Sequence, residues 1–183
     1  MIKFNKEIEL EGILNTAKLM AVSARTAPKS KGIDNIKIAL VTGDDIKKIR
    51  NKMKEIGERE NIPFFIRDSV CLESCQAILL IGVKKNPLGL TYCSYCGFKN
   101  CKEMKKNEAN CFFNIVDLGI AVCSAINTAS LIHADTRIMF SIGKTVKDMN
   151  IMGKEITQIL GIPLSATGKS PFFDREIQFE YNK

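Results

Sequence analysis

Four cysteines lie within 19 residues of this chain, in the order Cys93-x2-Cys96-x4-Cys101-x9-Cys111. The segment around them, at about residues 84–113, is rich in lysine and asparagine and is interrupted by proline and glycine. Neither a helical nor a strand period runs through it, so it has no apolar face with which to form a core. We therefore expect a loop-rich module that a bound metal group organises, inserted into a fold made by the rest of the chain.

The spacing of these cysteines favours an iron–sulfur cluster. Thiolates are the ligands that such clusters require, and a four-iron cubane takes four of them. A Cys-x2-Cys pair places two sulfurs on one turn, and the sharp bend expected at Gly97 would offer its N–H to a sulfide. The flanking aromatic side chains are expected to exclude water from the cluster; they are Tyr92, Tyr95, Phe98 and Phe112. A zinc ion is the alternative, although four-cysteine zinc sites usually use two Cys-x2-Cys pairs and this chain has one.

The remaining cysteines and the single histidine are expected to be structural. Cys71 and Cys75 lie four residues apart, so they could share a helix face and bind metal or form a redox pair, but small buried residues are the commoner case. Cys123 lies in an apolar segment and is expected to be buried. His133 has no cysteine or serine partner that would suggest a triad, so the sequence identifies no catalytic acid or base and a hydrolase is not expected.

Composition limits the class of protein. The chain has 183 residues, of which 45% are hydrophobic, and this suits a single domain over residues 1–183. The formal net charge of +7 comes mostly from scattered lysines, and no RNA-binding or helix-turn-helix signature accompanies it, so nucleic-acid binding is not expected. No run of about 18 apolar residues predicts a membrane span. The N-terminus lacks a signal-peptide pattern and the seven cysteines are odd in number, so we expect a cytoplasmic protein without a disulfide framework.

Hydrophobic periodicity predicts a mixed fold of the α/β or α+β class. Helices are expected over residues 6–24, 44–60, 115–134 and 145–160, with a short helix at 69–76 that Asp68 caps. Strands are expected over residues 36–41, 77–83 and 137–142, with a strand-like end at 176–179. Residues 77–83 form a near-continuous apolar run, which is typical of a central strand. Gly161 and Pro163 are expected to stop the last helix.

Three segments together resemble a family of uncharacterised proteins that contain a ferredoxin domain. They are Ala24-Arg25-Thr26-Ala27-Pro28-Lys29-x-Lys31-Gly32-Ile33-Asp34, the cysteine segment followed by Asp117-Leu118-Gly119-Ile120-Ala121-Val122, and Asp135-x-Arg137-Ile138-Met139-x-Ser141-Ile142-Gly143. The resemblance covers nearly the whole chain. It implies a [4Fe–4S] cluster held by Cys93, Cys96, Cys101 and Cys111.

The order of elements also resembles the nitroreductase fold, in which FMN lies between two subunits and an Ala-Pro-Ser loop lines it. The resemblance implies a homodimer and a flavin-binding loop made of Arg25, Ala27, Pro28, Lys29 and Lys31, whose cations would meet a phosphate. The Arg-Arg-Ser segment that grips the flavin phosphate in those enzymes is missing, so any FMN affinity is expected to be weak. A conformational role for this loop is the alternative.

Two functions remain open on this basis. The first is a redox protein that transfers electrons to an unidentified redox partner through the cluster, with a coupled flavin if FMN binds. The second is a non-catalytic binding protein or sensor in which the cluster, or a zinc ion, is structural.

Overall fold

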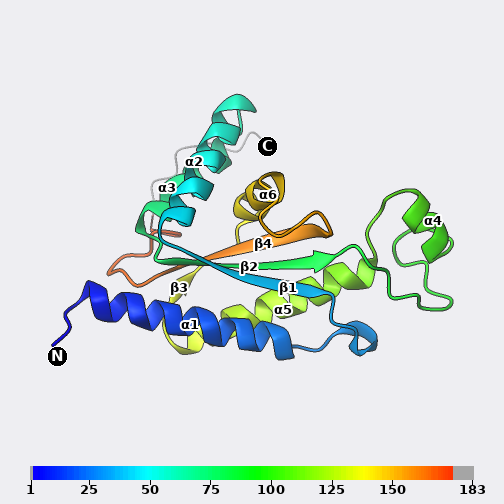
Figure 1. Cartoon of the computed structure of the whole chain (residues 1–183), viewed down its shortest axis with the longest axis horizontal. Helices are drawn as coiled ribbons and strands as arrows, with labels where there is room; N and C mark the ends of the chain where they lie inside the picture. The colour runs from blue at the N-terminus through cyan, green and yellow to red at the C-terminus, as the bar shows by residue number, and fades with distance from the viewer. Residues whose placement is uncertain (1, 175–183) are drawn as a thin grey trace.

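The computed structural model describes residues 2–174, and the strand-like segment 176–179 lies outside the described residues. Helices and strands are mixed along the chain (Figure 1). The elements are α1 (Lys6–Thr26), η1 (Ser30–Gly32), β1 (Ile36–Thr42), α2 (Asp44–Arg59), α3 (Pro63–Cys71), η2 (Leu72–Ser74), β2 (Ala77–Lys84), α4 (Cys101–Lys106), α5 (Phe112–Leu131), β3 (Asp135–Thr136), α6 (Phe140–Asp148) and β4 (Ile156–Ser165). The predicted mixed α/β class is confirmed.

One antiparallel sheet in the order β1-β2-β4-β3 forms the middle layer. Its central strand β2 is buried over its first seven residues, as the apolar run predicts. Side chains of successive strand residues point to opposite faces, so β2 contributes to two cores: Ile78 and Leu80 face one side, and Leu79 and Ile81 face the other.

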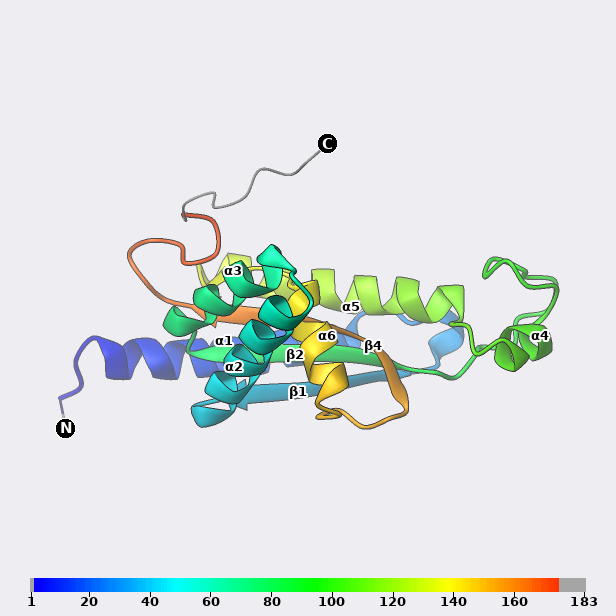
Figure 2. The same ribbon diagram turned by 90° about the horizontal axis from the view of Figure 1, so that it is seen from above.

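Two helical layers cover this sheet (Figures 1 and 2). Helices α1 and α5 lie side by side on one face and bury a stripe rich in alanine, including Ala17, Ala121 and Ala125. Helices α2, α3 and α6 cover the other face. Within the part of the chain that the structure describes, α5 is the one helix long and apolar enough to cross a membrane by length and composition, and 39% of its most apolar stretch is buried inside the protein.

The predicted helix over residues 145–160 is wrong. Helix α6 ends at Asp148, and residues 156–165 form the interior strand β4, so Gly161 and Pro163 lie within a strand rather than at a helix end. The N–H and C=O of Gly161 both form hydrogen bonds with Met139. Pro163 is two residues further along β4, so the position of its missing N–H is on the same side of the strand. The neighbouring strand on that side, β3, is only two residues long. A proline is therefore tolerated in this interior strand.

The predicted strand over residues 137–142 is also wrong. Strand β3 covers Asp135–Thr136, just before this segment, and the pairing within the segment is one isolated bridge at Met139. Helix α6 begins at Phe140 and packs directly on β4 through two glycines. A Cβ on Gly143 would lie 1.9 Å from the carbonyl oxygen of Ile159, and one on Gly161 would lie 2.2 Å from a methyl group of Ile142. Close helix–sheet contact therefore explains these glycines.

The short helix predicted at 69–76 begins earlier than expected. Helix α3 starts with Pro63 in its first turn and ends at Cys71, so Asp68 lies inside the helix and does not cap it. The buried Asp68 carboxylate instead accepts a hydrogen bond of 2.7 Å from the Ser141 hydroxyl and pairs with Arg67. This side chain ties α3 to α6.

Candidate functional site

The cysteine module extends from one end of the sheet, between the end of β2 and the start of α5 (Figures 1 and 2). It is mostly irregular, but it contains the short helix α4, which the sequence did not predict. The Asn100 side chain caps this helix by accepting a hydrogen bond of 2.9 Å from the Glu103 amide. Because Cys101 is the first residue of α4, the cap also fixes the backbone at one of the four cysteines.

A network of three asparagines fastens both stems of the module to the fold. The buried Asn114, in the first turn of α5, donates to the carbonyl oxygen of Asn86 at 2.8 Å and to that of Lys84 at 3.2 Å. Asn35, just before β1, donates to the Asn114 side chain at 3.1 Å and to the Asn86 carbonyl at 3.2 Å. Cys111 lies three residues before Asn114, so the network positions the module's last cysteine relative to its first stem.

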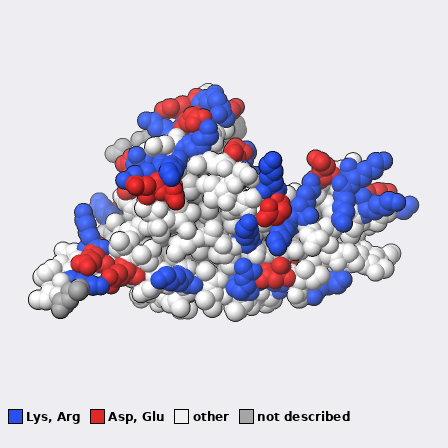
Figure 3. All heavy atoms as spheres, viewed as in Figure 1, with Lys and Arg blue, Asp and Glu red and all other residues white. Residues whose placement is uncertain are grey.

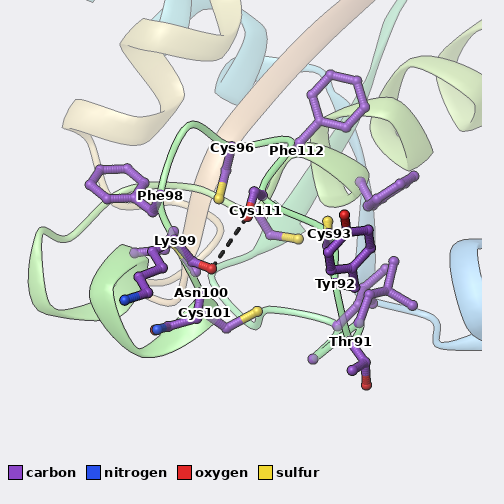
Figure 4. Close-up of a pocket in the computed structure, with 16 residues that line it drawn as sticks. Thr91, Tyr92, Cys93, Cys96, Phe98, Lys99, Asn100, Cys101, Cys111 and Phe112 are labelled. Atoms are coloured by element: carbon purple, nitrogen blue, oxygen red, sulfur yellow. Dashed lines mark hydrogen bonds between the residues drawn. The ribbon is translucent and has the colours of Figure 1, made fainter.

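The structure places Cys93, Cys96, Cys101 and Cys111 around one cavity of about 230 Å³ (Figure 4). The four side chains come from the irregular loop, the start of α4 and the residue before α5, and all four are half-buried. Leu88 and Met104 form a buried apolar wall of the same cavity. Four thiols from three parts of the module thus face one partly enclosed space with an apolar wall.

The loop around the first two cysteines is folded by left-handed backbone conformations. The φ angles are 54° at Tyr92, 53° at Ser94 and 83° at Gly97. Left-handed non-glycine residues are uncommon and cluster at functional loops. The sharp bend predicted at Gly97 is present, but its N–H donates to the carbonyl oxygen of Ser94 at 2.9 Å, so this amide closes a turn.

The aromatic side chains enclose the cavity only in part. The Tyr95 ring lies 5.5 Å from that of Phe112 and 5.6 Å from that of Phe113, measured between ring centroids, so the three form a small cluster. Phe98 is half-buried and lines the cavity, but Tyr92 is fully exposed and Tyr95 is 68% exposed. The cavity therefore lies close to solvent on its Tyr92 side.

The donor set fits an iron–sulfur cluster. All four candidate ligands are cysteines, which is the set that a cubane takes. Each thiolate of a cubane binds a different iron, so the sulfurs surround the cluster rather than meeting at a point. Among residues 2–174, no three His, Cys, Asp or Glu side chains are gathered closely enough to hold a single metal ion.

The segment predicted to bind flavin begins with Arg25 in the last turn of α1 and continues through the loop between α1 and β1, and α5 holds this loop. The Ser30 amide and hydroxyl both donate to the buried Asp117 carboxylate, at 3.0 and 2.8 Å. Sequence reasoning singled out this loop and the Asp117 motif separately, and the structure brings them together. It did not single out Ser30 as the contact.

The three cations of this loop have acceptors within the chain. Arg25 forms an ion pair with Asp34 and donates a hydrogen bond to the Ile36 carbonyl. Partial burial of the Asp34 carboxyl acts to raise its pKa, but the hydrogen bond from Arg25 acts against this, and the pKa is held below its usual range. The Lys29 ammonium donates to carbonyls at the end of α1, including that of Ala24 at 3.0 Å. The Lys31 ammonium donates to the carbonyl of Leu88, in the cysteine module, at 3.2 Å. The cations therefore link the loop to its neighbours, and a flavin phosphate would compete with these acceptors.

The other cysteines lie away from the cavity. Cys71 is buried at the end of α3, whereas Cys75 follows η2, so the two do not share a helix face as one interpretation required. Burial raises the pKa of the Cys75 thiol to about 12. Cys123 is exposed on α5, and the prediction that it is buried is wrong. His133 is exposed just after α5 with a φ of 59°, which is a turn position.

The fold is that of the nitroreductase class of proteins. The chain is similar to a nitroreductase family protein from Clostridium novyi NT, with a TM-score of 0.58 and 12% identity over 91% of this chain and 77% of that one. It is also similar to nitroreductase A from Vibrio parahaemolyticus, with a TM-score of 0.55 and 13% identity over 100% and 71% of the two chains. An oxidoreductase containing FMN gives a TM-score of 0.55 and 9% identity over 92% and 70%. At these identities the likeness concerns the fold.

Sequence comparison gives the family. A protein from Archaeoglobus fulgidus, described as an uncharacterized protein, is 43% identical over 96% of this chain and 98% of its own length. The family model that matches residues 107–175 is described as "Uncharacterized protein containing a ferredoxin domain (DUF2148)". The chain belongs to this family of ferredoxin-domain proteins on a nitroreductase-like fold.

Proposed function

We propose that this protein transfers electrons by means of a [4Fe–4S] cluster bound to Cys93, Cys96, Cys101 and Cys111. The observation that carries the proposal is the placement of these four thiols around one cavity. The ferredoxin-domain family and the oxidoreductase neighbours support a redox role. The cluster would supply one-electron chemistry when bound, while the cysteines would hold it and Leu88 and Met104 would keep water from its buried side.

The surroundings of the cavity favour electron transfer over catalysis at the metal. Four protein thiolates leave no iron of a cubane open to a substrate, so Lewis-acid chemistry is not expected. Because Tyr92 lines the cavity and is fully exposed, a partner protein could approach the cavity without a long electron path through the protein.

Anaerobic purification followed by chemical analysis tests this function. We expect about four irons and about four sulfides per chain and a broad absorption band near ~400 nm that bleaches on reduction. Stoichiometric zinc with no sulfide would refute the proposal.

A structural role for the metal group is the second candidate. The four cysteines connect the irregular loop, α4 and α5, so a bound group would act as a clip for a segment with little core of its own. The same preparation separates the two functions. A cluster that exchanges electrons reversibly with a dye supports the electron-transfer function. A redox-inert cluster or a zinc ion supports the structural function.

Flavin coupling, dimerisation and location are further parts of the proposal. We infer that any FMN binds weakly near residues 25–31, because the cations there already have acceptors. We infer a homodimer from the exposed apolar side chains of α5, which include Val116 and Ile120. We infer a cytoplasmic protein, because free cysteines suit a reducing compartment.

A further inference from the structure

The lysines of the cysteine module differ from those elsewhere in the protein. Residues 84–113 contain six lysines and two glutamates, and no aspartate or arginine. In the space-filling view, basic side chains gather at the end of the molecule where the module lies (Figure 3). The lysines are Lys84, Lys85, Lys99, Lys102, Lys105 and Lys106, and all six are exposed.

Helix α2 provides the comparison, because its lysines are paired. Lys47 and Lys48 each form an ion pair with an aspartate three residues earlier, at 2.7 Å in both cases. Lys54 pairs with Glu58 at 3.8 Å. This helix therefore has a charge-balanced surface of the kind that keeps a protein solvated.

The lysines of α4 have no such partners among residues 2–174. No ion pair joins Lys102, Lys105 or Lys106 to a carboxylate there. The acidic side chain of their own helix, Glu103, accepts a hydrogen bond from the Lys99 amide at 3.1 Å and so is held at the start of α4. Three positive charges therefore face solvent without a counterion from the part of the chain that the structure describes.

This basic surface adjoins the cavity of the four cysteines. Helix α4 begins at Cys101, and Lys99 lines the same cavity. A protein bound to the lysines would thus lie beside Lys99 and Cys101, two residues that line the cavity.

We propose that the surface formed by Lys99, Lys102, Lys105 and Lys106 docks the acidic face of a one-electron carrier protein. The proposal rests on the proposed function, since it places the redox partner beside the cluster site. Complementary charge steers such encounters and raises their association rate, and small transient interfaces depend on it because they bury little area. On docking, the reduced carrier would lose one electron and the oxidised cluster would gain it, with no bond or proton exchanged.

Binding to an acidic bacterial ferredoxin tests the proposal directly. Calorimetric titration of the anaerobically reconstituted protein with this ferredoxin, both in the oxidised state, measures docking independently of electron transfer. We expect binding at about 20 mM salt that weakens strongly at about 300 mM. The triple variant Lys102→Gln, Lys105→Gln, Lys106→Gln should bind about tenfold more weakly.

The matched control is Lys47→Gln, Lys48→Gln, Lys54→Gln, which removes the same charge from α2. Equal loss of affinity in both variants would mean that net charge alone matters and would overturn the proposal. It would also be overturned by tighter binding to a basic cytochrome, or by loss of RNA binding in the α4 variant with ferredoxin binding unchanged. An unchanged affinity with a shifted reduction potential would show that the lysines act on the cluster instead of on a partner.

The failure of the proposed function would look different. In that case iron and sulfide would be absent from the preparation, whatever the binding data. Two results together support docking. A small viologen dye should reduce the cluster equally well in both variants, and ferredoxin binding should be weaker in the α4 variant alone.

Discussion

The Asp117 carboxylate of α5 receives both the amide and the hydroxyl of Ser30, and it is 2% exposed. This pair joins the loop after α1 to the helix that follows the cysteine module. A buried carboxylate needs such donors, and the donors in turn lose their partner if it is removed. The contact therefore fixes the loop whether or not the loop binds a cofactor.

Replacement of Asp117 should destabilise the fold. We expect Asp117→Ala to lower the free energy of unfolding by about 2–3 kcal/mol, since it leaves two donors of Ser30 without a partner. Asp117→Asn should cost less, because its side-chain oxygen still accepts one hydrogen bond. Urea unfolding followed by circular dichroism measures both. Asp148→Ala, which breaks the exposed pair with Lys144, is the control and should cost under about 1 kcal/mol.

Each of the four cysteines should be needed for the cluster. Serine is a poor ligand for iron, so Cys93→Ser, Cys96→Ser, Cys101→Ser and Cys111→Ser should each lower iron and sulfide content and the absorption near ~400 nm. Cys123→Ser is the matched control, because this cysteine is exposed on α5 and lies outside the cavity. Full cluster content in any of the four variants would remove that residue from the ligand set.

How far the sequence predicts this structure depends on whether a signal is local. The two long helices and the strand β2 follow from periodicity and apolar runs that each segment carries itself. Strand β4 does not, because its glycine and proline indicate a helix end until tertiary packing is known. Gly161 is needed for the close approach of Ile142, a contact across two elements.

The candidate site divides in the same way. The four cysteines are predictable, because ligand chemistry restricts their type and spacing. The asparagines that fasten the module are not, since Asn35 and Asn114 are 79 residues apart and neither belongs to a recognisable pattern. The exposure of Cys123 is not predictable either, because the sequence of a helix that is apolar on nearly all sides does not indicate which side faces solvent.

The chain should form a dimer through the outer side of α1 and α5. Apolar side chains are exposed there, and they are Ile8, Leu19 and Val22 of α1 and Val116, Ile120 and Leu131 of α5. Burial of such a surface favours association. Light scattering at micromolar concentration should give about twice the chain mass of 20.4 kDa.

A charged pair of substitutions tests which surface is used. Val116→Lys with Ile120→Lys should give the monomer mass, because two lysines would be desolvated in the interface. Val70→Lys is the control, since Val70 is exposed on α3 across the sheet. A monomeric wild-type protein would contradict the prediction.

The Cys75 thiol should be unreactive in the folded protein. Burial raises its pKa from 9.0 to about 12, and its sulfur donates to the Ala77 carbonyl. The reactive thiolate is therefore scarce at neutral pH. Alkylation with iodoacetamide, read by mass spectrometry, should label Cys123 in the folded protein and Cys75 only after urea is added.

The same shift has a consequence for stability. Because the folded pKa is raised, the proton on Cys75 stabilises the folded state fully below the unfolded pKa of 9.0, and this contribution is lost as the pH rises toward about 12. The urea midpoint should thus fall between about pH 8 and about pH 10.5, and it should fall less in Cys75→Ala. An equal fall in the variant would assign the effect to other groups.

FMN should bind weakly, if supplied, at the loop that carries Arg25, Ala27, Pro28, Lys29 and Lys31. A phosphate would have to displace acceptors that the cations already have, namely Asp34 for Arg25 and the end of α1 for Lys29. Each charge-assisted contact that is not made costs about 1.5–3 kcal/mol, or roughly ten- to a hundredfold in affinity. Titration of the reconstituted protein, followed by flavin fluorescence, should give a Kd above the micromolar range.

Arg25→Ala with Lys29→Ala should weaken binding further, whereas Lys18→Ala, on the preceding helix, should leave it unchanged. No binding at about 100 μM FMN would leave the loop a structural connection to Asp117, and binding that survives the double variant would place the flavin elsewhere.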